Sequence, residues 1–453
     1  MPDRKANLAK RLDWVPARLV ELLETYHVPG GSVAVWYDGA EYLTAAGKAN
    51  VVADIDATPK TLFLIGSITK VYTATLVMQL VDDGAIDLDA PVAHYLPELR
   101  VADEDARATI TVRQLLSHTS GITGDYLPDC GRGDDAVERF VGTLVDAGML
   151  YRPGEMFSYC NSGFVLAGRL VERLTDGTWD AALRSRLLEP IDSTDLATLP
   201  EEALSRRVAV GHLRESGGTG WRVGQMWPEL RSGGPAGFTP FATGADVLRF
   251  ARLHLDGGVT PEGKRVLSSA SVAAMQAQEV IDSLSGPVES DGWGLGWARF
   301  RHGRDEPVIG HNGGSSATLR VLPDRDFAVT VLTNAGKGDL VGHRLVDDLV
   351  RELFELSIPV AGEPPSGFGD LAPYEGTYRH GSRQRRVVAK DDVLAAYDEE
   401  GTQISTLRPL DPTLFLSYDA GSDVTGRVSF IDAGEGRRPR YVHGAHRAFR
   451  RQD

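Results

Sequence analysis

Apolar residues recur at helical spacing in several segments of the first 357 residues, and each of these segments is expected to form a helix. The segment 67–83 has almost no polar face, which indicates a helix inside the domain. The predicted helices cover residues 16–26, 67–83, 137–148, 162–174, 244–256 and 338–357.

Two pairs of short β-prone runs lie between these helices. Residues 32–37 and 40–44 flank Asp38-Gly39, a pair typical of two-residue hairpin turns. Residues 317–322 and 327–332 are joined by the turn 323–326. Hairpins combined with amphipathic helices predict an α+β fold, with an antiparallel sheet flanked by helices and a helical subdomain.

The pattern changes after residue 358. The segment 359–369 is rich in Pro and Gly and is expected to be a linker between a domain of residues 1–358 and a second of residues 370–453. The second segment loses helical spacing and carries short β-prone runs separated by turns. This pattern predicts a small antiparallel barrel.

Composition excludes several classes of protein. The net charge of −15 repels phosphate backbones, so we expect no nucleic-acid partner. No apolar run reaches the ~18 residues of a membrane helix, and the first residues lack the apolar stretch of a secretory leader. Two cysteines cannot make a disulfide framework. We therefore expect a cytoplasmic protein that does not bind membranes.

The first chemical candidate is Ser67-x-x-Lys70, at the start of the apolar helix. Of the 8 lysines, only Lys70 has a serine three residues before it, and positions i and i+3 share a helix face. Burial would favour a neutral Lys70 amine, a general base for a Ser67 nucleophile. The alternative is an N-capping Ser67 and a surface Lys70.

Tyr159-x-Asn161 precedes the helix at 162–174. A phenol beside a lysine can be pushed toward phenolate and relay a proton to a leaving group. The alternative is a packed Tyr159 before an Asn161 N-cap. Cys160 between them has no histidine neighbour, so we interpret it as a packed thiol.

His311-Asn312-Gly313-Gly314 lies just before the second strand pair. His311 could polarise or protonate a substrate, and the glycines allow close approach of a backbone. The alternative is a loop histidine beside a turn. No His-x-x-x-His pair supports zinc, so we expect neither metal nor cofactor.

Taken in order, Ser67-x-x-Lys70, Tyr159-x-Asn161 and His311-x-Gly313 resemble the motifs of the penicillin-recognising serine hydrolases. Residues 114–121 and Trp293-Gly294-Leu295-Gly296-Trp297 also look like recurrent segments of that superfamily. The superfamily includes class C β-lactamases and D-alanyl-D-alanine carboxypeptidases. The resemblance covers residues 16–357 and implies a β-lactamase-like domain.

The resemblance implies roles for individual residues. Ser67 would be the acylated nucleophile and Lys70 its proton acceptor. Tyr159 would be the acid/base partner, and Asn161 would bond the substrate amide or Lys70. The N–H groups of Ser67 and Gly314 would form the oxyanion hole, with Asn312 and Gly313 against the substrate. His118 would be a packed residue.

One departure changes the expected substrate. The third motif of the superfamily usually begins with lysine, and here His311 takes that place. A mostly neutral imidazole suits a substrate carboxylate less well than an ammonium does. This form resembles the D-aminopeptidases and the penicillin-binding-protein-type thioesterases, which implies a lipocalin-like C-terminal barrel.

Three functions stay open from the sequence. The first is acyl transfer from a peptide-like ester, thioester or amide with a D-residue, including a peptidyl thioester on a carrier protein. The acyl group would pass to an amine, closing a macrocycle, or to water. The second is a carboxylesterase or weak β-lactamase. The third is a binding protein on an inactive scaffold. The loop 124–129 could be a lid over the site.

Overall fold

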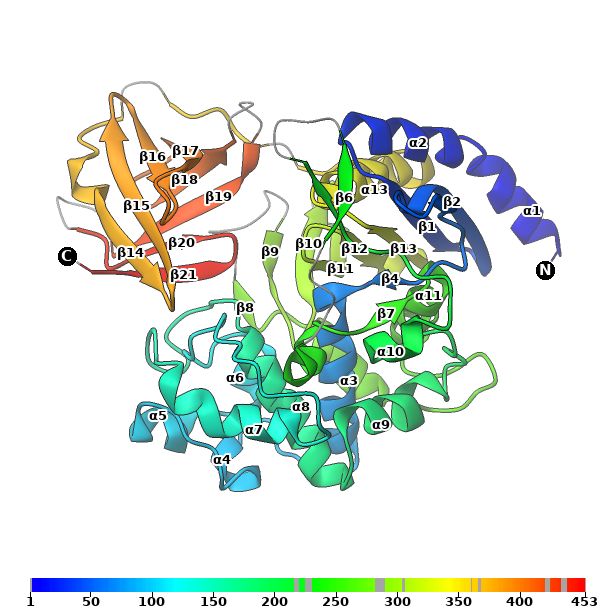
Figure 1. Cartoon of the computed structure of the whole chain (residues 1–453), viewed down its shortest axis with the longest axis horizontal. Coiled ribbons are helices and arrows are strands. Elements are labelled where there is room, and N and C mark those ends of the chain that lie inside the picture. The colour runs from blue at the N-terminus through cyan, green and yellow to red at the C-terminus, as the bar shows by residue number, and fades with distance from the viewer. Residues whose placement is uncertain are drawn as a thin grey trace.

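The computed structural model describes residues 2–215, 220–224, 230–281, 290–303, 306–359, 361–365, 368–419, 424–432 and 438–452. It forms an α+β body followed by a closed β-barrel (Figure 1). The α+β expectation with a small C-terminal barrel is confirmed. Three residues of the predicted linker, at positions 360, 366 and 367, lie outside the described residues.

The body is built on an antiparallel sheet of strand order β3-β2-β1-β13-β12-β11-β10-β9-β8. Both predicted hairpins are present, in the pairs β1–β2 and β12–β13. The strands of this sheet are β1 Gly30–Tyr37, β2 Ala40–Asn50, β3 Ile55–Asp56, β8 Val280–Ile281, β9 Ser290–Trp293, β10 Ala298–His302, β11 Glu306–Gly313, β12 Ala317–Leu322 and β13 Phe327–Thr333.

Successive side chains of a strand point to opposite faces of the sheet. Apolar or small residues occupy both faces here, so helices pack on both. Val33 and Val35 of β1 face the cluster that contains α2 and α13, whereas Ala34 faces the cluster of α3 and α11. The helices are α1 Pro2–Arg11, α2 Val15–Thr25, α3 Thr69–Asp82, α4 Val92–Tyr95, α5 Glu104–Thr109, α6 Val112–Leu116, α7 Ala136–Thr143, α8 Asn161–Thr175, α9 Trp179–Leu183, α10 Pro200–Ala203, α11 Gly244–Leu255, α12 Ser269–Gln276 and α13 Gly338–Phe354.

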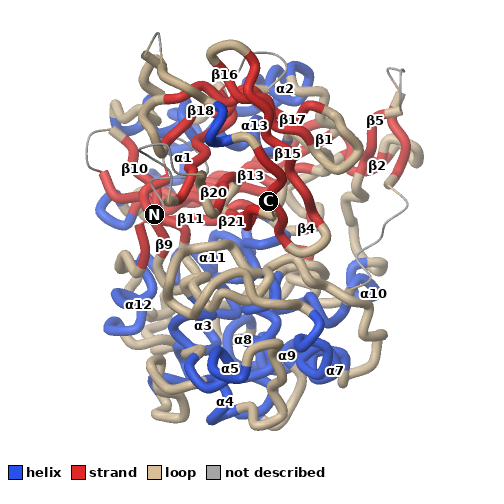
Figure 2. The backbone as a smooth tube through the Cα atoms, turned by 90° about the vertical axis from the view of Figure 1, so that its left-hand side faces the viewer, coloured by secondary structure: helices blue, strands red, loops and turns tan. Residues whose placement is uncertain are grey.

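The apolar helix predicted over 67–83 is α3, whose residues from Thr69 to Leu80 are all buried. It lies inside a subdomain of helices below the sheet, which Figure 2 shows as the blue half of the molecule. Several predicted helices are shorter than expected: α3 begins at Thr69, after a 3₁₀ turn at Gly66–Ile68, α7 gives way to a 3₁₀ turn at Leu144–Asp146, and α13 ends at Phe354.

The barrel has eight antiparallel strands and closes through the pair β14–β21. Alternate residues such as Tyr378, Phe415, Phe430 and Phe449 fill its interior. Its strands are β14 Gly376–His380, β15 Arg383–Lys390, β16 Val393–Tyr397, β17 Gln403–Pro409, β18 Leu414–Tyr418, β19 Val424–Ile431, β20 Tyr441–Gly444 and β21 Arg447–Arg451.

One hairpin of the barrel, β20–β21, packs directly on the body (Figure 1). The Tyr441 hydroxyl donates to the Leu150 carbonyl at 3.2 Å, and the Ala448 N–H donates to the Ser158 hydroxyl at 3.1 Å. These contacts place the hairpin turn beside residues 158–161, next to the predicted second motif.

Candidate active site

Ser67 lies in a tight 3₁₀ turn, Gly66–Ile68, between the short strand β4 (Phe63–Leu64) and α3. The turn needs glycine because Gly66 has φ +54°. Gly237, with φ +101°, packs so close that a Cβ there would lie 2.1 Å from the Gly66 carbonyl oxygen. The backbone is therefore fixed on both sides just before Ser67, which holds its hydroxyl at the start of α3.

Lys70 is fully buried one turn after Ser67. Its Nζ lies 3.0 Å from the Ser67 Oγ and 2.6 Å from the Ala236 carbonyl oxygen, and neither partner is acidic. Burial therefore lowers the pKa of Lys70 well below its ordinary value, and the Arg447 cation lowers it further. The alternative of a surface Lys70 is wrong, because its side chain is fully buried. In its neutral form the buried amine can accept the Ser67 proton.

Tyr159 lies against the same amine, with its ring centroid 4.9 Å from the Lys70 Nζ. Burial raises the pKa of Tyr159, and the Ser67 hydroxyl only partly opposes this effect. The phenol is therefore protonated at neutral pH. Burial of the phenol opposes the expected push toward phenolate by raising its pKa, so Tyr159 is poised as a proton donor.

Asn161 is the first residue of α8, and its Nδ2 donates to the Asp125 Oδ1 at 3.0 Å. The expected alternative partner, the Lys70 amine, bonds Ser67 and Ala236 in this structure. Cys160 caps α8 by accepting from the Gly163 N–H. Burial raises the pKa of Cys160 to about 11, which agrees with a packed thiol rather than a nucleophile.

His311 lies on β11 with its ring 6.0 Å from that of Tyr159. It is buried, and its Nδ1 lies 2.8 Å from the Asn312 carbonyl oxygen. Burial lowers the pKa of His311 to about 3. The imidazole is therefore neutral at physiological pH, as the departure from the lysine form implies.

The end of β11 brings the third motif to the nucleophile. A Cβ at Gly66 would lie 2.9 Å from the Gly313 carbonyl carbon, so the backbones before Ser67 and Gly314 are in contact. This places the two expected oxyanion residues side by side. The Asn312 side chain accepts from the Arg320 guanidinium at 2.8 Å.

Aromatic rings hold Tyr159 in place. His118 is fully buried and lies 4.4 Å from the Tyr159 ring, and Trp293 lies 5.7 Å from it. The His118 Nδ1 accepts from the Cys160 N–H at 2.9 Å. His118 is thus a packed residue, as expected.

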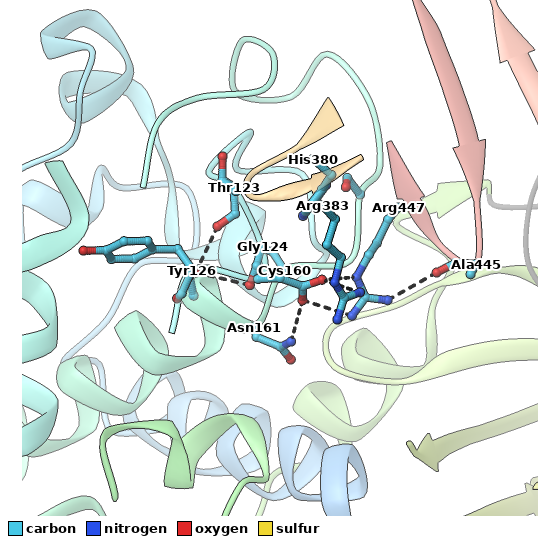
Figure 3. A network of polar contacts seen from close by, with 12 residues as sticks. Thr123, Gly124, Tyr126, Cys160, Asn161, His380, Arg383, Ala445 and Arg447 are labelled. Atoms are coloured by element: carbon cyan, nitrogen blue, oxygen red, sulfur yellow. Dashed lines mark hydrogen bonds and ion pairs between the residues drawn. The ribbon is translucent and has the colours of Figure 1, made fainter. Parts of the chain in front are cut away.

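Sequence reasoning missed a group that the barrel contributes (Figure 3). Asp125 accepts from the Arg447 Nε at 2.8 Å and pairs with Arg383 at 3.0 Å, in addition to its bond with Asn161. The Arg447 guanidinium lies 5.1 Å from the Tyr159 ring centroid. The His446 carbonyl also accepts from the Tyr159 N–H at 2.7 Å.

These contacts also bear on the loop 124–129. Besides Asp125, the Gly124 and Tyr126 carbonyls both accept from Ser162, at 3.2 and 3.1 Å. The first half of the loop is therefore tied to α8 and to the barrel, and it forms a wall of the site.

A cavity of about 530 Å³ opens beside β4, three residues before Ser67. Phe63, Leu64 and Phe241 give it an apolar floor, and Ser315 and Ser316 line the side that follows Gly314. The cavity therefore adjoins the oxyanion end of the site, although Ser67 itself does not line it.

Among the described residues there is no cluster of His, Cys, Asp or Glu able to hold a metal ion. The helices in the described ranges are all too short or too polar to cross a membrane.

Comparisons with known proteins identify the family of this chain. The sequence profile of the Beta-lactamase family matches residues 15–351. "Penicillin-binding protein 4" of Amycolatopsis lactamdurans is 43% identical over 386 residues, covering 83% of this chain and 98% of that protein.

Solved structures extend the likeness to the barrel. The crystal structure of SurE superposes with a TM-score of 0.81 at 30% identity, covering 98% of this chain and 99% of SurE. The D-amino acid amidase of Ochrobactrum anthropi SV3 has a TM-score of 0.62 at 23% identity and covers 76% of this chain and 97% of its own, which shows a shared fold. With its family profile spanning most of the chain, this protein belongs to the beta-lactamase family of serine acyl-transfer enzymes.

Proposed function

We propose that this protein transfers the acyl group of a peptide-like thioester, ester or amide through an acyl-Ser67 intermediate. The substrate would carry a D-residue at the acylating end and could be held as a peptidyl thioester on a carrier protein. The acceptor is an amine, which closes a macrocycle, or water. The observation that carries the proposal is the 3.0 Å contact between Ser67 Oγ and the buried Lys70 amine.

The chemistry follows from the protonation states. The Lys70 amine takes the Ser67 proton while Oγ attacks the carbonyl carbon, and the N–H groups of Ser67 and Gly314 stabilise the oxyanion. As the intermediate collapses, the bond to the leaving group breaks and Tyr159 supplies a proton to that group. The acceptor then attacks the ester, losing its proton through the same Tyr159–Lys70 pair, and Ser67 recovers its own.

The substrate class rests on the pocket. The apolar cavity beside β4 has room for several side chains of an acyl chain, and neutral His311 offers no cation to a carboxylate next to the scissile bond. Similarity to SurE over nearly the whole chain supports a D-residue, since one structure of that protein is described as a complex with D-Leu. The similarity to the D-amino acid amidase shows only a shared fold.

The test begins with the nucleophile. A fluorophosphonate should add its mass to the intact protein, and the modification should map to Ser67 and vanish in Ser67→Ala. The protein is then given a peptidyl thioester ending in a D-residue and its L-epimer. Cyclic or hydrolysed product from the D-substrate supports the proposal. Labelling that survives in Ser67→Ala, or no turnover of either epimer, contradicts it.

A further inference from the structure

The barrel end that faces the active site collects three guanidinium groups. Arg383, Arg385 and Val387 alternate on β15 and share one face, and Val387 packs in the barrel interior. Arg447 lies at the start of β21, on the same face as the interior residue Phe449. The mouth of the barrel that meets Asp125 is thus lined with cations (Figure 3).

Charge does not balance at this mouth. Asp125 is only 11% exposed and is shared between Arg383 and Arg447, which leaves one carboxylate for two cations. Burial would raise the pKa of Asp125, but Arg447 overrides this and holds it below its ordinary value. The carboxylate is therefore ionised and already committed to its two partners.

Arg385 has no anionic partner. Its guanidinium stacks on the Phe449 ring, 4.2 Å from the centroid, and among the described residues no carboxylate or carbonyl bonds it. Gly444 makes room for it, because a Cβ at that position would lie 3.0 Å from the Arg385 Nη1. Burial lowers the pKa of Arg385 to about 10, and Arg447 and Arg383 add to this effect. A partly buried guanidinium among like charges is costly unless an anion joins it.

We propose that Arg385, supported by the positive field of Arg447, forms an anion subsite at the mouth of the barrel, which binds an oxyanion carried by the leaving group or acyl acceptor of the substrate. The Arg447 guanidinium is itself bonded to Asp125 through Nε and Nη2 and to the Ala445 carbonyl through Nη1. The position assigns that side of the substrate, since Arg447 lies 5.1 Å from the ring of Tyr159, the residue that exchanges protons with both groups. Paired N–H groups of a guanidinium suit a carboxylate or a phosphate.

This subsite rests on the proposed function and separates two kinds of recognition. The His311 imidazole on β11 is uncharged, so the site does not favour an anion next to the acyl carbonyl. The barrel instead supplies fixed positive charge farther out. The two sources of an oxyanion are a carboxylate on the departing or attacking group and the phosphate of a pantetheine arm.

The test uses one peptidyl group on three leaving groups: neutral N-acetylcysteamine, 3-mercaptopropionate and 4′-phosphopantetheine. In Arg385→Gln, kcat/KM should fall about 10- to 100-fold for the substrates with the recognised anion, chiefly through KM. It should change less than about twofold for the neutral thioester. Arg385→Lys should restore part of the loss.

Arg386 provides a matched control, because it is the next residue on β15 and stacks on Tyr397 at the outer face. Arg386→Gln should leave all three values unchanged. A loss confined to the carboxylate or to the phosphate substrate supports the subsite and identifies the source of the anion. Equal losses for all three substrates, or no loss, overturn it. If wild type acylates Ser67 with none of them, the proposed function itself fails.

Discussion

Two basic regions lie beside the same tyrosine, and they deal with buried charge in opposite ways. In the catalytic corner, Lys70 is fully buried with a hydroxyl and a carbonyl as its partners. At the mouth of the barrel, Arg447 is 20% exposed and makes a two-point contact with the Asp125 carboxylate.

The difference follows from the two side chains. A lysine can release its proton when burial makes the charge costly, whereas an arginine keeps its charge and needs a counter-ion. The buried Lys70 can therefore act as a base, whereas Arg447 at the barrel mouth provides a fixed positive charge. Tyr159 lies within about 5 Å of both groups, which is how a domain far along the chain reaches the reaction.

The largest expected effect comes from placing an arginine in the corner. Lys70→Arg keeps a cation beside Ser67 but cannot lose its proton, so activity should fall by about 10²–10⁴-fold. The measurement is the rate of Ser67 labelling by a fluorophosphonate, compared at equal folded fraction with Lys70→Gln. Near wild-type labelling of Lys70→Arg would mean that Lys70 is not the base.

The second prediction concerns Tyr159. Tyr159→Phe removes the protonated phenol and keeps the ring against His118, so turnover should fall by about 10²–10⁴-fold while the fold persists. Because Lys70 and Tyr159 serve one proton path, the double variant should be little worse than the poorer single variant. Multiplicative losses in steady-state kcat/KM would show independent roles.

The same comparison separates what the sequence can and cannot predict. Ser67 and Lys70 are three residues apart, and Tyr159 and Asn161 two apart, so local spacing identifies them. Asp125 and Arg447 are 322 residues apart, and only the packing of the barrel on the body brings them together.

Even the hairpin that makes this contact gives no sequence signal. The turn at Ala445 and His446 has φ +50° and +63°, values for which Asn-Gly or Asp-Gly is the usual sign. The hairpin at Asp38-Gly39 carries that sign, and the sequence predicts it correctly. Two non-glycine residues in this conformation are held by tertiary contacts, including the bond from the Tyr159 N–H to the His446 carbonyl.

A third prediction tests the neutral corner through its substrate preference. Wild type should turn over a cephalosporin reporter more slowly than a neutral peptidyl ester, because His311 has a pKa of about 3 and offers no charge. His311→Lys should raise the cephalosporin-to-ester ratio of kcat/KM about tenfold if its ammonium meets the carboxylate. Equal efficiency in wild type would favour a true β-lactamase.

The smallest expected effect is a change in pH dependence, and it couples the two regions. Lys70 acts as the free amine, so activity is lost as pH falls through its pKa. Arg447 lowers that pKa and Asp125 raises it, with Cys160 also acting to raise it. Arg447→Gln should therefore move the acid limb of kcat/KM to higher pH, and Asp125→Asn should move it to lower pH.

The neutral peptidyl ester is the substrate for these profiles, since it carries no anion for the barrel mouth to bind. The residues packed around the Lys70 amine stay unchanged in both variants, and Arg386→Gln serves as the control on the outer face of the barrel. Both variants remove a partner from the same ion pair, so a purely structural effect would move the two limbs together. Shifts of opposite sign in the two acid limbs can arise only from the charges themselves. A common shift, or no shift, would show that Arg447 and Asp125 do not influence the pKa of Lys70.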